Sequence, residues 1–265
     1  MVNPSFLLYD RFMKIEAVFF DIDGTLVDLY TRKIPSSTIK ALNELREKGI
    51  KLFICSGRNP DYRIQLNKEI PFMFDGYIFM NGQWIADKDG KCLYAKAFDK
   101  VTKEKLYEHF KKHPEIFFTV YSDKGRYTNS AKTNNPFIKP NPRDISNILT
   151  EEVYQLSAFE TAEEDKLVEE IEGCKCARWG IGTDIIPSAG GKDSGVKEVL
   201  KIFDIDKENT MAFGDGENDI AMFKAVNLSV AMNGANDVVK KVATEITDNC
   251  IDDGIYNALK RNGVI

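Results

Sequence analysis

The residues whose types and spacing could do chemistry begin with two aspartates, Asp21 and Asp23, in the segment DIDGTL at residues 21–26. The apolar run directly before them, residues 17–20, predicts a short buried strand. Open α/β sheets bind ligands at the carboxyl ends of their strands. Because two neighbouring carboxylates repel each other, the pair favours a divalent cation, and hard oxygen ligands favour Mg²⁺. One aspartate could then act as a nucleophile and the other as a general acid and base.

A plainer interpretation of this segment is a turn at Asp23 and a helix cap at Asp21. A second acidic loop, GDGEND at residues 214–219, weighs against that interpretation. It also follows a short strand pattern, residues 210–213, and it also precedes a helical pattern. If the two strands are neighbours, we expect Asp21, Asp23 and Asp215 to converge on one cation.

Two further segments suit an anionic substrate. Ser56, Gly57 and Arg58 follow the strand pattern of residues 51–55, and a hydroxyl with backbone N–H groups can hold phosphate oxygens there. Lys192 lies behind two glycines at the expected start of a helix, where its ammonium can bind a phosphate. Together these segments predict a phosphate site next to the acidic cluster.

These four segments resemble, in this order, the four motifs of haloacid dehalogenase-like phosphatases. The chain is most similar to the Cof-type group, subclass IIB, of sugar-phosphate phosphatases, and the similarity spans about residues 14–265. Residues 230–256 also resemble the C-terminal signature of that group. Two departures are the order Asn-Gly at residues 233–234 and Asp193 directly after Lys192, where a glycine is usual. Neither departure removes a catalytic group, so they bear on loop geometry and substrate detail.

The resemblance implies hydrolysis of a small phosphate monoester in two steps. Asp21 is expected to attack phosphorus and become an aspartyl phosphate, with Asp23 as general acid and then general base. The resemblance also implies that Mg²⁺ is held by Asp21, the backbone carbonyl of Asp23 and Asp215. Asp219 is expected to support this metal site without ligating the ion.

The remaining predicted site residues bind phosphate or substrate: Ser56, Gly57, Arg58, Lys192 and Asn218. For Arg58, a contact with substrate and a pairing with a local acid both stay open. Asn218 is expected to position Lys192 or a phosphate oxygen. Two alternative functions also remain. One is a phosphotransferase or mutase on the same scaffold, and the other is a signalling domain that stores phosphate on an aspartate without hydrolysis.

The elements that must position these residues alternate between strand and helix in the first and last thirds of the chain, which predicts a Rossmann-like parallel-sheet core. The middle of the chain has strand patterns joined by turns, which predicts an α+β cap domain with an antiparallel sheet. The predicted division is a leader at 1–13, core at 14–82 and 189–265, and an inserted cap at 83–188. Within the cap, a helix is predicted at residues 162–172.

The composition of the chain limits the kinds of molecule that it is expected to bind. The 265 residues carry a net charge of −5, which argues against a general nucleic-acid binder. No apolar run approaches the length of a membrane-spanning helix, so no membrane is expected. Five scattered cysteines without a CxxC pair favour the reducing cytoplasm. We therefore expect a cytoplasmic monomer or weak homo-oligomer whose partner is a small phosphorylated metabolite.

Other residues could also bind a metal or a substrate, but each has a plainer interpretation. His109 and His113 have the spacing of a zinc pair on a helix, but we interpret them as part of a solvated helix end before Pro114. In the expected cap, the arginine–aromatic pairs at 126–127 and 178–179 are candidate substrate contacts. A core aromatic next to a surface arginine is the alternative for each pair.

Overall fold

A computed structural model describes residues 14–132, 139–158, 168, 170–179 and 182–265 of the chain. Within these residues the strands form two sheets, one of eight strands and one of five. The predicted leader at 1–13 lies outside the described residues, and so does most of the helix predicted at 162–172.

The eight-stranded sheet has the order β13-β12-β11-β1-β2-β3-β4-β5. The first six strands in this order pair in parallel, and β4 and β5 continue the sheet as antiparallel neighbours. Their bounds are β1 Ala17–Phe20, β2 Lys51–Cys55, β3 Gly76–Phe79, β4 Trp84–Asp87, β5 Cys92–Ala95, β11 Thr210–Gly214, β12 Leu228–Ala231 and β13 Glu245–Ile246.

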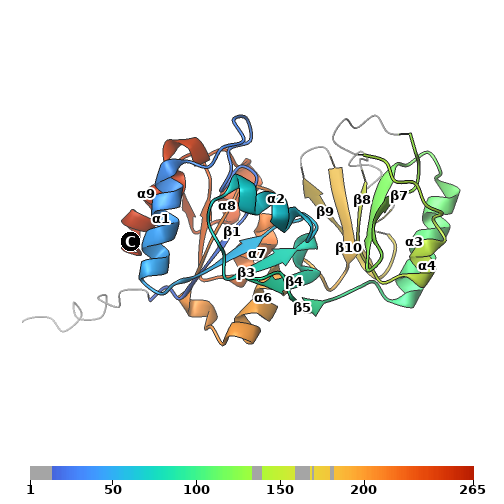
Figure 1. Ribbon diagram of the computed structural model, residues 1–265, viewed down its shortest axis with the longest axis horizontal. Helices are drawn as coiled ribbons and strands as arrows, with labels where there is room; N and C mark the ends of the chain where they lie inside the picture. Colours follow the sequence, from blue (N-terminus) through green and yellow to red (C-terminus); the bar gives the residue numbers. More distant parts are fainter. Residues whose placement is uncertain (1–13, 133–138, 159–167, 169, 180–181) are drawn as a thin grey trace, which may run out of the picture.

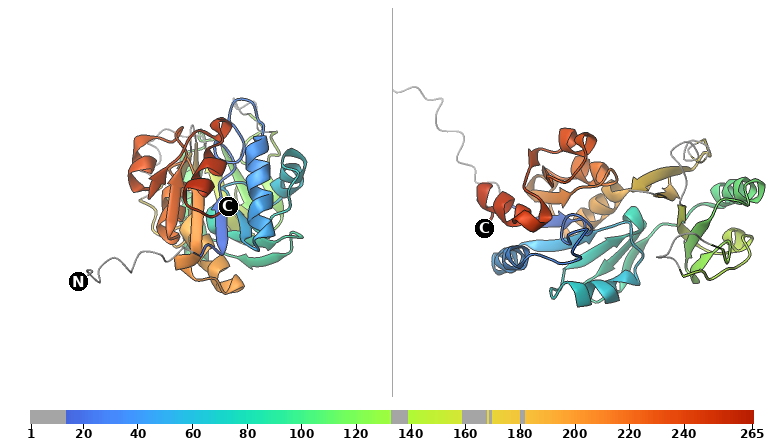
Figure 2. Two further views of the ribbon diagram at one scale, coloured as in Figure 1. Left: turned by 90° about the vertical axis from the view of Figure 1, so that its left-hand side faces the viewer. Right: turned by 90° about the horizontal axis from the view of Figure 1, so that it is seen from above.

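Helices cover both faces of this sheet, as parallel strands buried on two sides require (Figures 1 and 2). One face packs against α1 (Ser36–Glu47), α2 (Tyr62–Glu69) and α9 (Gly254–Arg261), and the other against α6 (Lys192–Phe203), α7 (Asp219–Ala225) and α8 (Asp237–Val242). In the described part of the chain there are also short 3₁₀ turns, η2 (Met80–Gly82), η3 (Lys207–Asn209) and η4 (Cys250–Asp252). Because successive side chains of a strand alternate, Phe20 and Phe19 enter opposite cores.

The five-stranded sheet is antiparallel, in the order β7-β6-β8-β10-β9. Its strands are β6 Phe118–Ser122, β7 Gly125–Thr128, β8 Val153–Ala158, β9 Cys174–Trp179 and β10 Gly182–Pro187. Helices α3 (Lys100–Lys112) and α4 (Asn147–Thr150) lie on the side turned away from the eight-stranded sheet (Figure 1).

Alternation along these strands gives the five-stranded sheet one apolar and one polar face. Leu156 and Ile185 are register partners, and both belong to the apolar core beside α3. The neighbouring register pair, Ser157 and Asp184, therefore points to the other face. This polar face is the one that meets the eight-stranded sheet.

The predicted fold class, an α/β core with an inserted α+β unit, is confirmed by this arrangement. Strands β4 and β5 differ from the predicted division, because they lie within 83–188 and yet continue the eight-stranded sheet. A sequence pattern shows that a strand exists but does not show which sheet it joins. Among the described residues, no helix combines the length and apolar character that crossing a membrane requires.

Candidate active site

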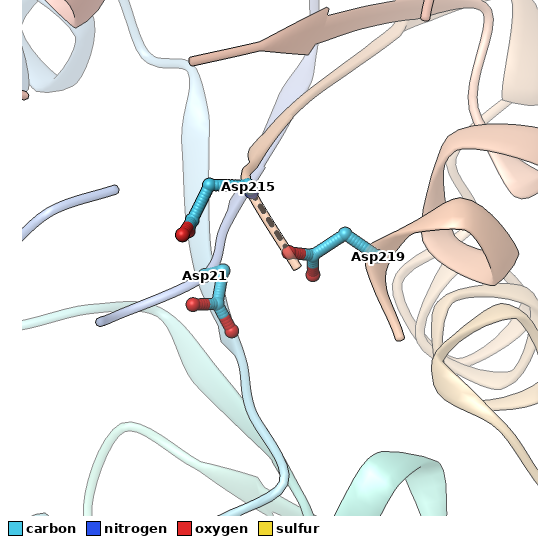
Figure 3. A group of neighbouring side chains, drawn as sticks. All are labelled: Asp21, Asp215 and Asp219. Carbon is cyan, nitrogen blue, oxygen red and sulfur yellow. Dashed lines mark hydrogen bonds between the residues drawn. The ribbon is translucent and has the colours of Figure 1, made fainter. Parts of the chain in front are cut away.

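The acidic cluster forms where two neighbouring strands end. Strands β1 and β11 pair in parallel, and the backbone N–H of Asp21 donates to the carbonyl of Phe213 at 3.0 Å. Asp21 and Asp215 each follow one of these strands, as the sequence predicts. Carboxylate oxygens of Asp21, Asp215 and Asp219 all lie within 4.8 Å of one another (Figure 3).

Lys192, the first residue of α6, extends its side chain into this cluster. Its buried ammonium lies 2.5 Å from Oδ1 of Asp21 and 2.5 Å from Oδ1 of Asp219. Burial lowers the pKa of Lys192, but the charges of the two aspartates outweigh burial and raise it, so the amine is a fixed cation. The Lys192 ammonium thus lies between Asp21, the residue predicted as nucleophile, and Asp219, the first residue of α7.

Two carboxyl groups of the cluster, those of Asp21 and Asp215, have raised pKa values. Burial raises the pKa of Asp21 well above its usual value, with Asp219 and Asp215 adding to the increase and Lys192 opposing it. Burial and the nearby Asp219 charge raise the pKa of Asp215 to about 7. Asp21 and Asp215 are therefore two facing carboxyl groups that a cation would stabilise in their ionised form.

Asp219 has both of its oxygens engaged by protein groups. Oδ2 accepts from the backbone N–H of Asp215 at 3.0 Å (Figure 3). Oδ2 also accepts from the backbone N–H of Gly216 at 2.9 Å, and Oδ1 accepts from Lys192. Asp219 therefore holds the loop that carries Asp215 and also holds Lys192, which suits the predicted supporting role.

The loop after β1 packs closely on Asp215. Gly24 has a φ of +86°, and a Cβ at that position would lie 2.2 Å from Oδ2 of Asp215, so glycine is required on both counts. The Thr25 hydroxyl donates to Oδ1 of Asp215 at 2.8 Å. These contacts fix the two acidic loops against each other.

Asp23 faces a pair of arginines. Nε of Arg58 lies 2.8 Å from Oδ2 and Nη2 lies 2.8 Å from Oδ1, while Nη1 of Arg32 lies 2.6 Å from Oδ1. The Arg58 guanidinium also lies 4.0 Å from the ring centroid of Tyr62. Burial raises the pKa of Asp23, but the charges and hydrogen bonds of Arg58 and Arg32 outweigh burial and hold the pKa below its usual value. Of the two roles left open for Arg58, this structure shows the pairing with an acid.

The other predicted phosphate-binding residues surround the same space. Ser56 follows β2, and its Oγ accepts from the backbone N–H of Arg58 at 3.2 Å. The Asn218 amide donates to Oδ1 of Asn81 at 3.3 Å, so its recorded partner is Asn81 rather than Lys192.

A cavity of about 720 Å³ lies between the acidic edge of the eight-stranded sheet and the polar face of the five-stranded sheet. The first sheet and its loops contribute the predicted residues Asp21, Asp23, Ser56, Gly57, Arg58, Asp215 and Asn218. The second contributes Tyr121, Gln155, Ser157, Arg178, Trp179 and Asp184. The site is therefore shared between the two sheets.

Of the residues considered in the expected cap, Arg178 and Trp179 line this cavity. Tyr127 is instead buried in the core beside α3, and Arg126 is exposed. The rings of His109 and His113 lie 4.8 Å apart near the end of α3, and neither lines the cavity.

Tyr121, Gln155, Ser157 and Asp184 line the cavity but were not predicted from the sequence as site residues. The available signal was a polar residue at every second position of an otherwise apolar strand, as with Gln155 and Ser157 in β8. Such alternation is also the ordinary pattern of a strand with one solvated face, so it does not mark a site by itself.

The sequence model of the haloacid dehalogenase-like hydrolases matches residues 18–259 of the chain. The Bacillus subtilis (strain 168) protein YkrA, whose name provisionally assigns it to the phosphatases, is 30% identical over 96% of this chain and 100% of its own length. Another B. subtilis relative, 5-amino-6-(5-phospho-D-ribitylamino)uracil phosphatase YcsE, is 27% identical over 93% of this chain and 95% of its own length.

Two solved structures share the architecture over almost their whole length. BT1666 from Bacteroides thetaiotaomicron, a phosphatase of the haloalkanoate superfamily, superimposes with a TM-score of 0.87 and 28% identity, covering 98% of this chain and 100% of that one. The subclass IIB sugar phosphatase BT4131 superimposes with a TM-score of 0.82 and 32% identity, covering 94% and 100%.

Proposed function

The chain belongs to the haloacid dehalogenase-like hydrolases, as a Cof-type phosphatase, and from this premise we propose that it hydrolyses a small sugar phosphate through an aspartyl phosphate on Asp21. The observation that carries the proposal is the convergence of Asp21, Asp215, Asp219 and Lys192 at one edge of the sheet. An acidic cluster with a buried ammonium suits a reaction that brings a phosphate dianion onto a carboxylate nucleophile.

In the first step an oxygen of Asp21 attacks phosphorus, and the bond from phosphorus to the substrate oxygen breaks. The electron pair of that bond stays on the leaving oxygen, which takes a proton from Asp23. Lys192 neutralises charge that builds on the phosphoryl oxygens, and Ser56 with the N–H groups of its loop binds those oxygens. Asp219 keeps Lys192 in place through the 2.5 Å contact with its ammonium.

In the second step Asp23 removes a proton from water, and the water oxygen displaces Asp21 from phosphorus. Asp23 is ready for this role, since Arg58 and Arg32 favour its ionised form. Donation in the first step requires the protonated form. We propose that Arg58 turns from Asp23 towards the substrate phosphate when substrate binds, which releases Asp23 to carry the proton.

The residues present fit Mg²⁺. The carboxylate oxygens of Asp21 and Asp215 lie within 4.8 Å of each other, both groups have raised pKa values, and hard oxygen donors suit this ion. We propose that Asp21, Asp215 and the backbone carbonyl of Asp23 hold it, with Asp219 supporting the loop. When bound, the ion would offset the repulsion between the carboxylate nucleophile and the phosphate dianion.

The rest of the cavity supports a polar substrate. Gln155, Ser157, Arg178 and Asp184 offer hydrogen-bond donors and acceptors, and Trp179 and Tyr121 offer aromatic surface. Sugar rings combine hydroxyl groups with apolar C–H faces, which matches this lining. We propose that the cap begins after β5, because β4 and β5 belong to the other sheet, and that it sets substrate preference. We also propose a cytoplasmic location, because five scattered cysteines without a CxxC pair suit a reducing compartment.

The test is a panel of phosphorylated sugars, nucleotides and p-nitrophenyl phosphate, assayed for inorganic phosphate without any acceptor alcohol. We expect phosphate release with a preference for one or a few sugar phosphates. Release only when an acceptor is added would indicate a phosphotransferase or mutase. Phosphorylation without turnover would indicate the signalling domain.

A further inference from the structure

Asn81 lies at the junction between the two sheets, in the 3₁₀ turn η2 after β3. Its backbone is left-handed, with φ 51° and ψ 41°, a conformation that asparagine tolerates better than most residues. The residue is 1% exposed. Its N–H donates to the carbonyl of Ser56 at 3.1 Å, and its own carbonyl accepts from Gly191 at 3.1 Å. The backbone of Asn81 is thus tied to the loops that precede Arg58 and Lys192.

The side chain of Asn81 bridges to the five-stranded sheet. Nδ2 donates to Oδ2 of Asp184 at 2.8 Å and to Oε1 of Gln155 at 3.2 Å. Oδ1 accepts from Asn218 at 3.3 Å. Both amide hydrogens and the carbonyl oxygen of Asn81 therefore have partners, two on the second sheet and one in the loop after β11.

The partners are joined to one another as well. Ser157 Oγ donates to Oδ1 of Asp184 at 2.5 Å, and Nε2 of Gln155 donates to the carbonyl of Gly57 at 3.1 Å. The pKa of Asp184 is raised to about 6, because the effect of burial outweighs the hydrogen bonds from Ser157 and Asn81, which lower it. A buried network whose members are mutually satisfied fixes one arrangement, because each broken bond leaves a polar group unpaired in a low dielectric.

Gly57 leaves no space between the network and the phosphate-binding loop. A Cβ on Gly57 would lie 2.8 Å from Oδ2 of Asp184 and 3.0 Å from Nδ2 of Asn81. The backbone that follows Ser56 therefore rests directly on the Asn81–Asp184 pair.

We propose that Asn81 is a positioning residue that couples the placement of the five-stranded sheet to the phosphate-binding groups, through its bonds to Asp184, Gln155 and Asn218. The inference rests on the proposed function of the site but assigns a role to residues outside the reaction itself. Asn81 lines a neighbouring cavity with Lys192 and Asn218, and its side-chain amide is already bonded to Asp184, Gln155 and Asn218. Its proposed action on the phosphate-binding groups therefore passes through Gly57 and Asn218. When the second sheet moves away, the network opens and the loops lose their support.

Asn81→Asp tests the coupling with little change in shape. It removes both donors and places a carboxylate against Asp184 and Gln155. If the closed arrangement then becomes a minor state, substrate must drive closure, and KM for p-nitrophenyl phosphate should rise about tenfold with kcat within about twofold. Asn43→Asp, the same change at an exposed position of α1, is the matched control and should leave both constants unchanged.

Exchanging the two partners tests whether the effect passes through Asp184. In Asn81→Asp combined with Asp184→Asn, the new amide can donate to the new carboxylate, so the central bond is restored with its direction reversed. We expect KM to return to within about threefold of the wild-type value. A double variant no better than Asn81→Asp would contradict the coupling. So would a kcat that falls as much as KM rises, because that pattern indicates a role in the chemical step.

Hydrogen exchange without substrate separates this inference from the proposed function. Asn81→Asp should speed exchange at the amides of residues 56–58 and 216–218 at least about tenfold relative to Asn43→Asp, and should leave β1 unchanged. If Asn81→Asp does not fold, Asn81→Gly keeps the left-handed backbone and removes all three side-chain bonds of Asn81. Unchanged exchange at both loops would overturn the coupling, even in an active phosphatase. Faster exchange in a protein that hydrolyses no phosphate ester would support the coupling and overturn only the proposed function.

Discussion

Arg58 holds the carboxylate of Asp23 with two hydrogen bonds, Nε to Oδ2 at 2.8 Å and Nη2 to Oδ1 at 2.8 Å. This geometry places a fixed positive charge on the residue proposed to donate a proton. This pairing holds the pKa of Asp23 below its usual value, and in the proposed mechanism the acid form of Asp23 requires that Arg58 change partners.

Arg58→Lys should shift the pH dependence of the reaction. The lysine cannot form the two-bond contact, so the pKa of Asp23 should rise, and Asp23 should stay protonated to higher pH. The alkaline limb of kcat/KM for a sugar phosphate should then move upward by about half a unit to one unit. Arg46→Lys, which retains a charge on the exposed surface of α1, is the control. An alkaline limb at the same pH in all three proteins would contradict the link between Arg58 and Asp23.

Binding of Mg²⁺ should release protons near neutral pH. The pKa of Asp215 is raised to about 7, so Asp215 tends to hold a proton below pH 7 that the ion must displace. The pKa of Asp21 is raised as well, which adds to the proton release. Apparent affinity should therefore increase as pH rises from 6 to 8. Calorimetry in two buffers of different ionisation enthalpy measures the release directly. Affinity independent of pH across this range would show that these carboxyl groups do not ligate the ion.

Asp23→Ala should affect poor leaving groups most. A sugar alkoxide needs a proton as it departs, whereas p-nitrophenolate hardly does, so the loss in kcat should be at least about tenfold larger for the sugar phosphate. Both substrates should slow, because the second step still requires a base. Equal losses for the two substrates would mean that Asp23 does not protonate the leaving group.

Asp21→Asn should abolish turnover and preserve the fold. The amide cannot act as nucleophile, and kcat should fall below about a thousandth of the wild-type value. Because burial and neighbouring acids already disfavour the charge of Asp21, thermal stability should hold or rise. Asp89→Asn, the same change at an exposed turn, is the matched control. A variant that unfolds, or that keeps a tenth of the activity, would contradict the assignment.

The convergence of Asp21, Asp215 and Lys192 could be predicted from the sequence, because each of these residues lies in a short contiguous segment with a recognisable pattern. Asp21 and Asp215 each follow an apolar run, and parallel neighbours β1 and β11 necessarily bring such segments together. Lys192 was recognisable from its place at the start of a helix. The place of each residue at the end of a strand or the start of a helix determined where its side chain lies, so the local sequence pattern was enough to predict it.

The Asn81 network was not predictable in the same way. Asn81 and Gly82 have the composition of an ordinary turn, and nothing near them in sequence indicates bonds to Asp184 and Gln155, which are 103 and 74 residues away. The pairing of Arg58 with Asp23 likewise depends on how loops after different strands meet. Contacts of this kind arise from tertiary packing, which periodicity does not encode.

The most direct test of the account is to look for the covalent intermediate. Wild-type enzyme mixed with p-nitrophenyl phosphate and Mg²⁺ should be quenched in acid within milliseconds, digested and examined by mass spectrometry. We predict a phosphoryl group on Asp21, formed and lost at rates that match turnover, and absent in Asp21→Asn. Full turnover with no phosphoryl group on Asp21 at any time, or with the group on another residue, would contradict it.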